Sequence, residues 1–318
     1  MQETRRMTRF SVRAATFYAA SSFLLVSSSQ AALGQQKSAV RHASTTENWS
    51  AVEQTLGRKG APNPGDVMKF GFPRSDLQVM VGDVQLKPAL ALGGWVAFKP
   101  LAGGKAVALG DLVLTSDEVG PVMQRLQQDG ISQTAVHNHL LGENPRVMYM
   151  HIMAEGDPVK LAETLHAALG ESQTPMTIAT AASPSAAIDL DTAAVARALG
   201  YAGKVNGGVY QVSVPRAERI VDMRTEIPPS MGVATGINFQ PTGSGKAAIT
   251  GDFVLLSSEV NPVMRTLREN GIQVTAVHSH MLGESPRLFF MHFWANDDAT
   301  KLANGLHAAL AQTNSKRS

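Results

Sequence analysis

Histidine is the residue type whose spacing points most clearly to chemistry in this chain. Two histidines stand two residues apart and a third follows twelve residues after them. This motif occurs twice, at His137, His139 and His151, and again at His278, His280 and His292. Imidazole nitrogens are common ligands of transition metals. Since the chain has no cysteine, a metal must be held by nitrogen or oxygen ligands, or by methionine. The two motifs therefore predict a site for a divalent transition metal: Zn, Cu, Mn or Fe.

A glutamate and an arginine accompany each histidine set. Glu143 and Arg146 belong to the first set, and Glu284 and Arg287 to the second. If the metal activates water, each glutamate is a candidate general base and each arginine a candidate site for an anionic substrate. The chain would then be a metal-dependent hydrolase. A salt bridge that fixes the turn explains the same four residues equally well.

The expected strand geometry decides whether each histidine set can converge. Alternate residues of a strand share a face, so His137 and His139 should project together. After the LLGENP turn, His151 lies on a neighbouring antiparallel strand. It joins the other two only if His137 stands opposite Tyr149 or His151, a parity that the sequence leaves open. It also leaves open whether each copy forms its own site or both sets meet at an interface.

A structural role for the histidines is the alternative to metal binding. In that case the imidazoles only hydrogen-bond within the fold, and the chain is a non-catalytic envelope interaction module. Two further histidines, His166 and His307, fall in a predicted helix near its leucines. Helix packing or a place at the surface is the expected role for this pair.

Most of the chain consists of two copies of one repeat. Aligned at an offset of 141 residues, roughly 35 of the 60 positions of 110–169 are identical to those of 251–310. In each copy the apolar periodicity and the turn signals predict alternating strands and helices. For the first copy these are strands at 94–99 and 106–114, a helix at 117–128, strands at 134–140 and 147–153, and a helix at 158–169. Ser116 and Asp157 are the expected N-caps. The predicted fold class is α+β, a tandem duplication of a ferredoxin-like (β-α-β-β-α) sandwich domain.

The segments outside the repeats have their own composition. Four arginines and an apolar run precede a stretch of small residues, which predicts a signal peptide. Removing it leaves 24 basic and 25 acidic residues, a net charge of −1, which argues against a nucleic-acid partner. A periplasmic or secreted protein with no stable membrane anchor after cleavage is expected, with a metal ion or small molecule as partner and no particular protein partner indicated. The predicted organisation is a signal peptide at 1–31, a flexible terminus at 32–46, repeat domains at 47–170 and 188–311, a linker at 171–187, and a tail at 312–318.

Long motifs in both copies resemble a known family. The strings TAVHNHLLGENPRVMYMH and TAVHSHMLGESPRLFFMH, with FPRSDLQVMVGDVQLKPALALGGWVAFKP upstream, are similar to the LppY/LpqO family of secreted bacterial proteins and lipoproteins. The resemblance covers about residues 48–311. It implies a domain of unknown function and carries over no activity. The second copy has no counterpart of Trp95, so if that segment shapes a pocket, the two copies differ there.

Overall fold

The computed structural model describes residues 49–176 and 187–316. Within them the chain is of mixed α and β class, and both repeats belong to one compact unit. The predicted signal peptide, the flexible terminus and ten residues of the predicted linker, 177–186, lie outside the described residues. No helix of the described part combines the length and the apolar character needed to cross a membrane.

The two repeats contain matching elements. The first repeat consists of α1 (Trp49–Leu56), β1 (Ala61–Asn63), β2 (Val67–Pro73), β3 (Met80–Val81), β4 (Val84–Gln85), α2 (Pro88–Ala91), β5 (Gly93–Pro100), β6 (Ala106–Thr115), α3 (Ser116–Gln128), β7 (Ser132–His137), β8 (Glu143–Asn144), β9 (Val147–Gly156) and α4 (Pro158–Leu169). The second consists of α5 (Thr192–Leu199), β10 (Lys204–Asn206), β11 (Val209–Pro215), β12 (Val221–Asp222), β13 (Thr225–Glu226), the 3₁₀ helix η1 (Pro229–Met231), β14 (Ala234–Gly243), β15 (Lys246–Leu255), α6 (Ser257–Glu269), β16 (Gln273–His278), β17 (Phe289–Asp298) and α7 (Ala299–Leu310).

Each repeat forms one six-stranded antiparallel sheet. The strand orders are β1-β2-β5-β6-β9-β7 and β10-β11-β14-β15-β17-β16. In the first sheet β9 lies between β6 and β7, the two strands that α3 connects. The predicted succession of strand, helix, two strands and helix is present as β6, α3, β7, β9 and α4. The strands predicted at 94–99 and 106–114 are β5 and β6, which pair as an antiparallel hairpin.

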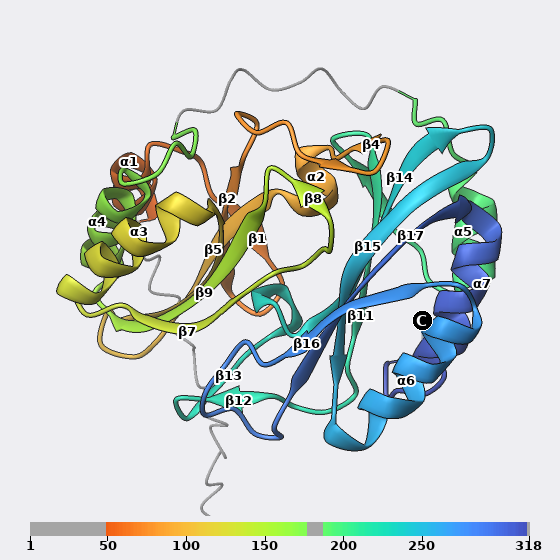
Figure 1. The fold of residues 1–318 in the computed structure, drawn as a ribbon. Helices are drawn as coiled ribbons and strands as arrows, with labels where there is room; N and C mark the ends of the chain where they lie inside the picture. Colours follow the sequence, from red (N-terminus) through yellow and green to blue (C-terminus); the bar gives the residue numbers. More distant parts are fainter. Residues whose placement is uncertain (1–48, 177–186, 317–318) are drawn as a thin grey trace, which may run out of the picture. The chain divides into compact units, whose positions relative to one another are not determined.

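The sheets are covered by helices on one face and by each other on the second face (Figure 1). The sequence of strand β6 is almost continuously apolar because both faces of the strand are buried. Ala108 and Leu112 belong to the core beneath α1, α3 and α4, whereas Val107 and Leu109 belong to a core shared with the second repeat. A strand buried on both faces loses the polar alternation of a half-exposed strand.

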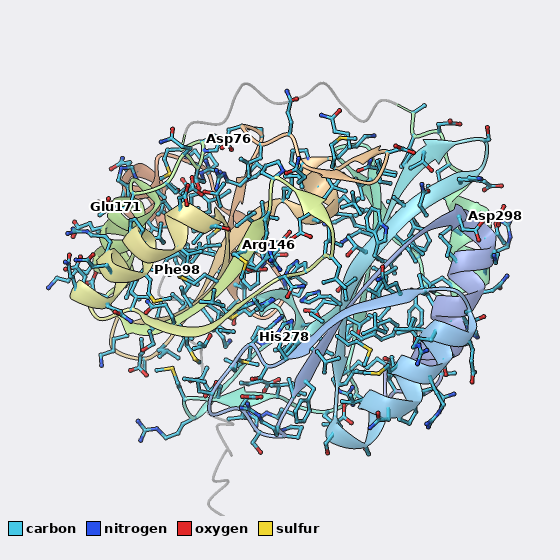
Figure 2. The ribbon with its side chains drawn as sticks, in the orientation of Figure 1. Asp76, Phe98, Arg146, Glu171, His278 and Asp298 are labelled. Atoms are coloured by element: carbon cyan, nitrogen blue, oxygen red, sulfur yellow. The ribbon has the colours of Figure 1, made fainter. Side chains whose placement is uncertain are left out.

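The loop segment of each repeat packs against the sheet of the other. Ile220 and Met231, from the η1 side of the second repeat, share a core with Val107 and Met153 of the first sheet. In the mirrored core, Leu90 of α2 is joined, among others, by Val79, Val209 and Ala248. The two repeats therefore complete each other's cores, with His278 lying between the sheets and Phe98 beneath the helices of its own repeat (Figure 2).

Capping residues set the helix ends. Helix α3 begins at Ser116, one residue earlier than predicted, because Thr115 is the N-cap and its backbone N–H donates to Glu118 at 2.8 Å. Asp157 caps α4 as predicted, accepting from the backbone N–H groups of Val159 and Lys160.

Candidate metal centre

The register between β7 and β9 brings the first histidine set onto one face. His137 stands opposite Tyr149, which is the even register that convergence requires. His151, two residues further along β9, therefore points to the same side as His137. On the other flank of β9, His151 pairs with Asp111 of β6.

His139 joins the same group of rings, but from a bend rather than from the strand on which it was expected. Strand β7 ends at His137, so His139 lies in the bend after the strand rather than on its face. Its ring nevertheless stands 5.1 Å from the ring of His137 and stacks on Tyr149, with 3.3 Å between the ring centroids. The tyrosine hydroxyl donates to the carbonyl of Ala91, which holds this platform in place.

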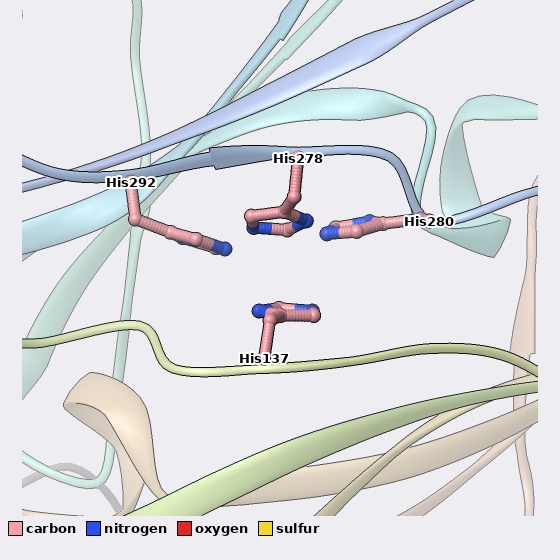
Figure 3. A group of neighbouring side chains, drawn as sticks. All are labelled: His137, His278, His280 and His292. Atoms are coloured by element: carbon pink, nitrogen blue, oxygen red, sulfur yellow. The ribbon is translucent and has the colours of Figure 1, made fainter.

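The two histidine sets meet as a single six-histidine cluster between the repeats. The second repeat uses the same register, with His278 opposite Phe290 and Asp252 opposite His292. Three pairs of rings then face each other across the repeats, with centroid separations of 3.6 to 3.8 Å: His137 with His278, His139 with His292, and His151 with His280. Figure 3 shows His137 of the first repeat facing the three histidines of the second.

Each imidazole of the cluster presents a buried nitrogen without a hydrogen-bond partner. All six Nε2 atoms are in this state among the described residues, and so is Nδ1 of His278. In His292 the other nitrogen, Nδ1, lies 2.9 Å from the carbonyl oxygen of Gly251, which fits an Nδ1–H donor and a free lone pair on Nε2. Leaving a buried polar atom unpaired costs about 1–3 kcal/mol, so seven such atoms in one place call for a ligand.

Burial also keeps the imidazoles neutral. It lowers the pKa of His137 to about 4 and that of His278 to about 3. Burial, reinforced by the neighbouring imidazoles, holds the pKa values of the other four well below the usual value. A neutral imidazole has the lone pair that a metal needs, so the cluster is competent to bind metal at neutral pH.

Two groups of nitrogen atoms are close enough to share an ion. One comprises His137, His278, His280 and His292, and the other comprises His137, His139 and His151; within each group the ligand atoms lie within 4.8 Å of one another. A metal at about 2.1 Å from its nitrogens holds them about 3–4 Å apart. Small side-chain movements therefore suffice to close either group around an ion.

Two aspartates belong to the cluster, and sequence reasoning missed their role. Oδ1 of Asp111 lies 3.8 Å from Nε2 of His151, and Oδ2 of Asp252 lies 3.6 Å from Nε2 of His280. Burial raises the pKa of Asp111 to about 8 and that of Asp252 well above its usual range. The sequence did contain a signal for them: both aspartates hold the same repeat position, each inside a largely apolar strand.

The predicted glutamates and arginines are not members of the cluster. Glu284 accepts from the backbone N–H of Leu288 and pairs with Arg287 at 3.1 Å, which is the turn-fixing salt bridge considered above. Glu143 is buried in β8, paired with β3, and Arg146 is exposed. None of these four residues lines the cavity beside the histidines or joins their metal-ligand groups.

A cavity of about 770 Å³ opens beside the cluster. Its lining includes four of the six histidines, both aspartates, and Lys69 and Trp95 of the first repeat. A volume of this size accommodates a small organic molecule.

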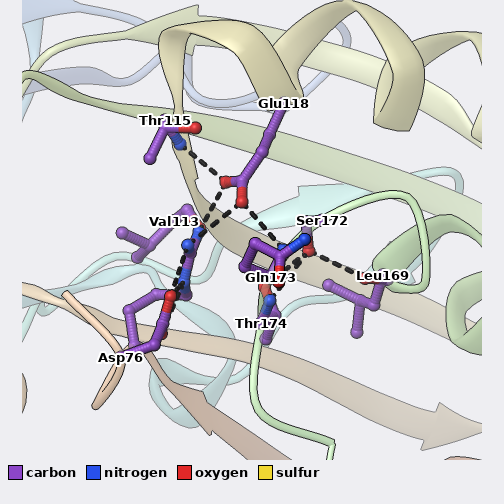
Figure 4. A network of polar contacts seen from close by, with 9 residues as sticks. Asp76, Val113, Thr115, Glu118, Leu169, Ser172, Gln173 and Thr174 are labelled. Carbon is purple, nitrogen blue, oxygen red and sulfur yellow. Dashed lines mark hydrogen bonds and ion pairs between the residues drawn. The ribbon is translucent and has the colours of Figure 1, made fainter.

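A buried cluster of charges around Arg74 is paired throughout, in contrast to the histidines. Arg74 donates to Glu118 at 2.6 Å and to Asp76 at 2.8 Å, and Glu118 also accepts from the backbone of Gln173 (Figure 4). The second repeat has the equivalent network around Arg216. This network joins the end of β2 to the start of α3 and to the segment after α4, and its role is structural.

Comparison with known proteins gives one family. A family model described as Domain of Unknown Function (DUF1259) matches residues 50–171 and 193–312, which confirms two copies of one domain. None of the curated proteins matches the chain. Among solved structures, a trimeric bacterial microcompartment shell protein, PduB, is 12% identical with a TM-score of 0.21, over 80% of this chain and 89% of that one. A TM-score this low supports no conclusion about this chain.

Proposed function

Since the chain belongs to a family described as Domain of Unknown Function (DUF1259), which names no activity, we propose a function from its residues: it binds a divalent transition metal at the six-histidine cluster. The observation that carries this proposal is the set of six buried, unpaired Nε2 atoms where the two repeats meet. A purely structural role would pair these atoms, as the fold does around Arg74.

The ligand chemistry narrows the metal. Six neutral imidazoles favour Zn, Cu or Fe, whereas Mn prefers oxygen ligands and would need the nearby carboxylates. Asp111 and Asp252 lie close enough to their histidines to orient the rings or to complete the coordination sphere.

The number of ions that the cluster can hold is limited because its two ligand groups share a histidine. His137 belongs to both ligand groups, so the four-histidine group and the three-histidine group cannot both be complete. One ion at the four-histidine group, or two ions each held by the three histidines of one repeat, are the two stoichiometries that the cluster supports.

Metal content per chain tests the proposal. The tag-free protein is stripped with EDTA, reconstituted separately with Zn, Cu, Mn or Fe, dialysed, and measured by elemental mass spectrometry. We expect one or two ions per chain in the wild type and less than a tenth of that in the His137→Ala/His278→Ala variant. The matched control is His166→Ala/His307→Ala, a repeat-equivalent pair outside the cluster, which should keep the full metal content. Circular dichroism confirms that each variant is folded, and a wild type that retains none of the four metals would refute the proposal.

A metal-dependent hydrolase is the second candidate, supported by the cavity beside the cluster. In this version Asp111 and Asp252 replace Glu143 and Glu284 as the candidate acid–base residues, because only the aspartates line the cavity. Burial raises the pKa of both, and the positive charge of a bound metal would lower it again and favour the carboxylate that acts as a base. Turnover of p-nitrophenyl acetate by the metal-loaded protein should fall at least 100-fold in Asp111→Asn/Asp252→Asn, with metal still bound. The Glu143→Gln/Glu284→Gln variant should keep its activity. A metal-loaded wild type without turnover would leave binding alone, or the non-catalytic envelope module, as the function.

We also propose three finer assignments. Each repeat is a ferredoxin-like sandwich in which β5, preceding the helices, occupies the position beside β6 that a strand after α4 would otherwise take, and the sheet continues beyond it with β2 and β1. The family is that of the LppY/LpqO proteins. The protein is exported to the periplasm or the medium after cleavage near residue 31, which the intact mass of the mature protein would test.

A further inference from the structure

The cavity beside the cluster breaks the symmetry of the two repeats. Lys69 of β2 corresponds to Gln211 of β11, since the FPR and VPR motifs that follow them align at an offset of 142 residues. Trp95 corresponds to Gly236, because these residues pair with Gly71 and Ser213, which are equivalent. All four residues line the cavity. One wall therefore carries a cation and an aromatic ring, and the other carries an amide and no side chain.

Lys69 has spare hydrogen-bonding capacity. Its Nζ lies 3.8 Å from the centroid of the Trp95 ring and donates to the carbonyl of Ser230 at 3.3 Å. Within the described part of the chain Lys69 forms no ion pair within 4.0 Å, and the carboxyl that acts on it from further away is that of Asp111 in the same cavity. An ammonium group has three N–H donors, so at least one remains for a ligand. Gln211 is different because it is neutral: its amide nitrogen donates to the carbonyl of Ala89 at 2.8 Å and its amide oxygen accepts from Asn206 at 3.1 Å, so it offers a carboxylate no charge.

The opposite wall is open. A Cβ atom added at Gly236 would meet no heavy atom within 4 Å, so space begins directly at the backbone of β14. A molecule anchored at Lys69 can therefore extend across the histidines toward Gly236, and the difference between the walls allows one orientation.

We propose that the cavity binds one organic acid per chain, with its carboxylate on Lys69 and its organic body lying over the histidine cluster toward Gly236. This inference deepens the proposed metal function by naming the class of molecule that lies over the cluster. Its anchor is a lysine outside the cluster, so binding is measurable with and without metal. A carboxylate bound to a partly buried ammonium forms a charge-assisted hydrogen bond, which an uncharged analogue of the same shape cannot form.

Calorimetric titration with benzoate, and with benzamide as its uncharged analogue, tests the inference on both EDTA-treated and Zn-treated protein. We expect benzoate to bind at one per chain and benzamide at least tenfold more weakly. Lys69→Gln, which installs the residue of the second repeat, should weaken benzoate binding roughly tenfold or more. Lys204→Gln is the matched control, because Lys204 also lines the cavity but is exposed. Gly236→Leu should weaken benzoate by filling the open side.

The outcomes separate this inference from the metal proposal. Failure of benzoate to bind, equal binding of benzamide, or equal losses in Lys69→Gln and Lys204→Gln would overturn the organic-acid site. Metal content is measured on the same samples. Benzoate binding that depends on Lys69, in a protein that retains no metal, would support this inference and refute the proposed function. Retained metal without benzoate binding would support the proposed function and refute this inference.

Discussion

The metal-free protein should lose stability steeply as the pH falls below about 6.5, because of the buried imidazoles. An unfolded histidine has a pKa of about 6.5, whereas burial lowers the pKa of His137 to about 4 and that of His278 to about 3. The unfolded chain therefore binds protons first. The stability that these residues allow is present above pH 6.5 and is lost as the pH falls toward their folded pKa values.

The magnitude follows from the same values. One pKa unit corresponds to about 1.4 kcal/mol, so protonation costs the folded state about 3 kcal/mol at His137 and about 5 kcal/mol at His278. Between about pH 6 and pH 4 this pair alone gives a slope of about 3 kcal/mol per pH unit. The other four histidines act in the same direction. Asp111 opposes them, because burial raises its pKa to about 8 and its contribution is present at low pH and lost as the pH rises through that value.

Urea unfolding at a series of pH values measures this slope. The free energy of unfolding is determined by circular dichroism in EDTA between pH 5 and pH 7.5, with a constant m-value as the check on two-state behaviour. His137→Gln/His278→Gln should flatten the profile by about 3 kcal/mol per pH unit. A wild-type free energy that stays level from pH 7 to pH 5, or a variant with the wild-type slope, would refute the reasoning.

Three further predictions concern the rest of the fold and the metal. Arg74→Met should lower the free energy of unfolding by about 3–5 kcal/mol because it leaves Glu118 buried without its partner, and adding Glu118→Gln should recover part of the loss in the same urea assay. Gly251→Ala should cost about 2 kcal/mol or more, since its Cβ would meet the backbone of Gly236, while Gly236→Ala, which meets nothing, should cost less; thermal melts of the two compare them directly. Adding metal at 1,000 times its dissociation constant should stabilise the EDTA-treated protein by about 4 kcal/mol, and an unchanged melting temperature would contradict specific binding to the folded state.

Local patterns in the sequence were sufficient for the elements that carry the site. The duplication, the β5–β6 hairpin, the strand that carries His151 and the helix capped by Asp157 all follow from periodicity, turn residues and caps, which are local properties. The sequence could not give the register of β7 against β9, which brings His137 and His151 together. A register shift between Gln133 and Ala135 interrupts the pairing of β7 with β9, and no local pattern specifies such a bulge.

The shared cluster itself lies beyond local patterns. Ring stacking of His139 on His292 joins residues of different repeats, and periodicity within one repeat carries no information about that contact. The position of Glu143 close to the histidines in both copies pointed to the wrong carboxylate. Glu143 is held in β8, whereas Asp111, far from His151 in sequence, stands beside it on the paired strand β6. The absence of a second Trp95 was visible in the sequence, but its meaning required the position of Lys69.

The exchange of covering segments between the repeats has a consequence for how such a protein arises. Each repeat supplies the loop segment that covers the core of the other repeat, and three of the six histidines. The two subunits of a symmetric dimer share a site in the same way. A single-copy ancestor would have needed two identical chains to make this centre, and every substitution would have appeared on both sides of its axis. Fusion into one polypeptide removes that restriction. It permits lysine and tryptophan on one wall of the cavity and glutamine and glycine on the other, so a cavity that began with two-fold symmetry can become asymmetric.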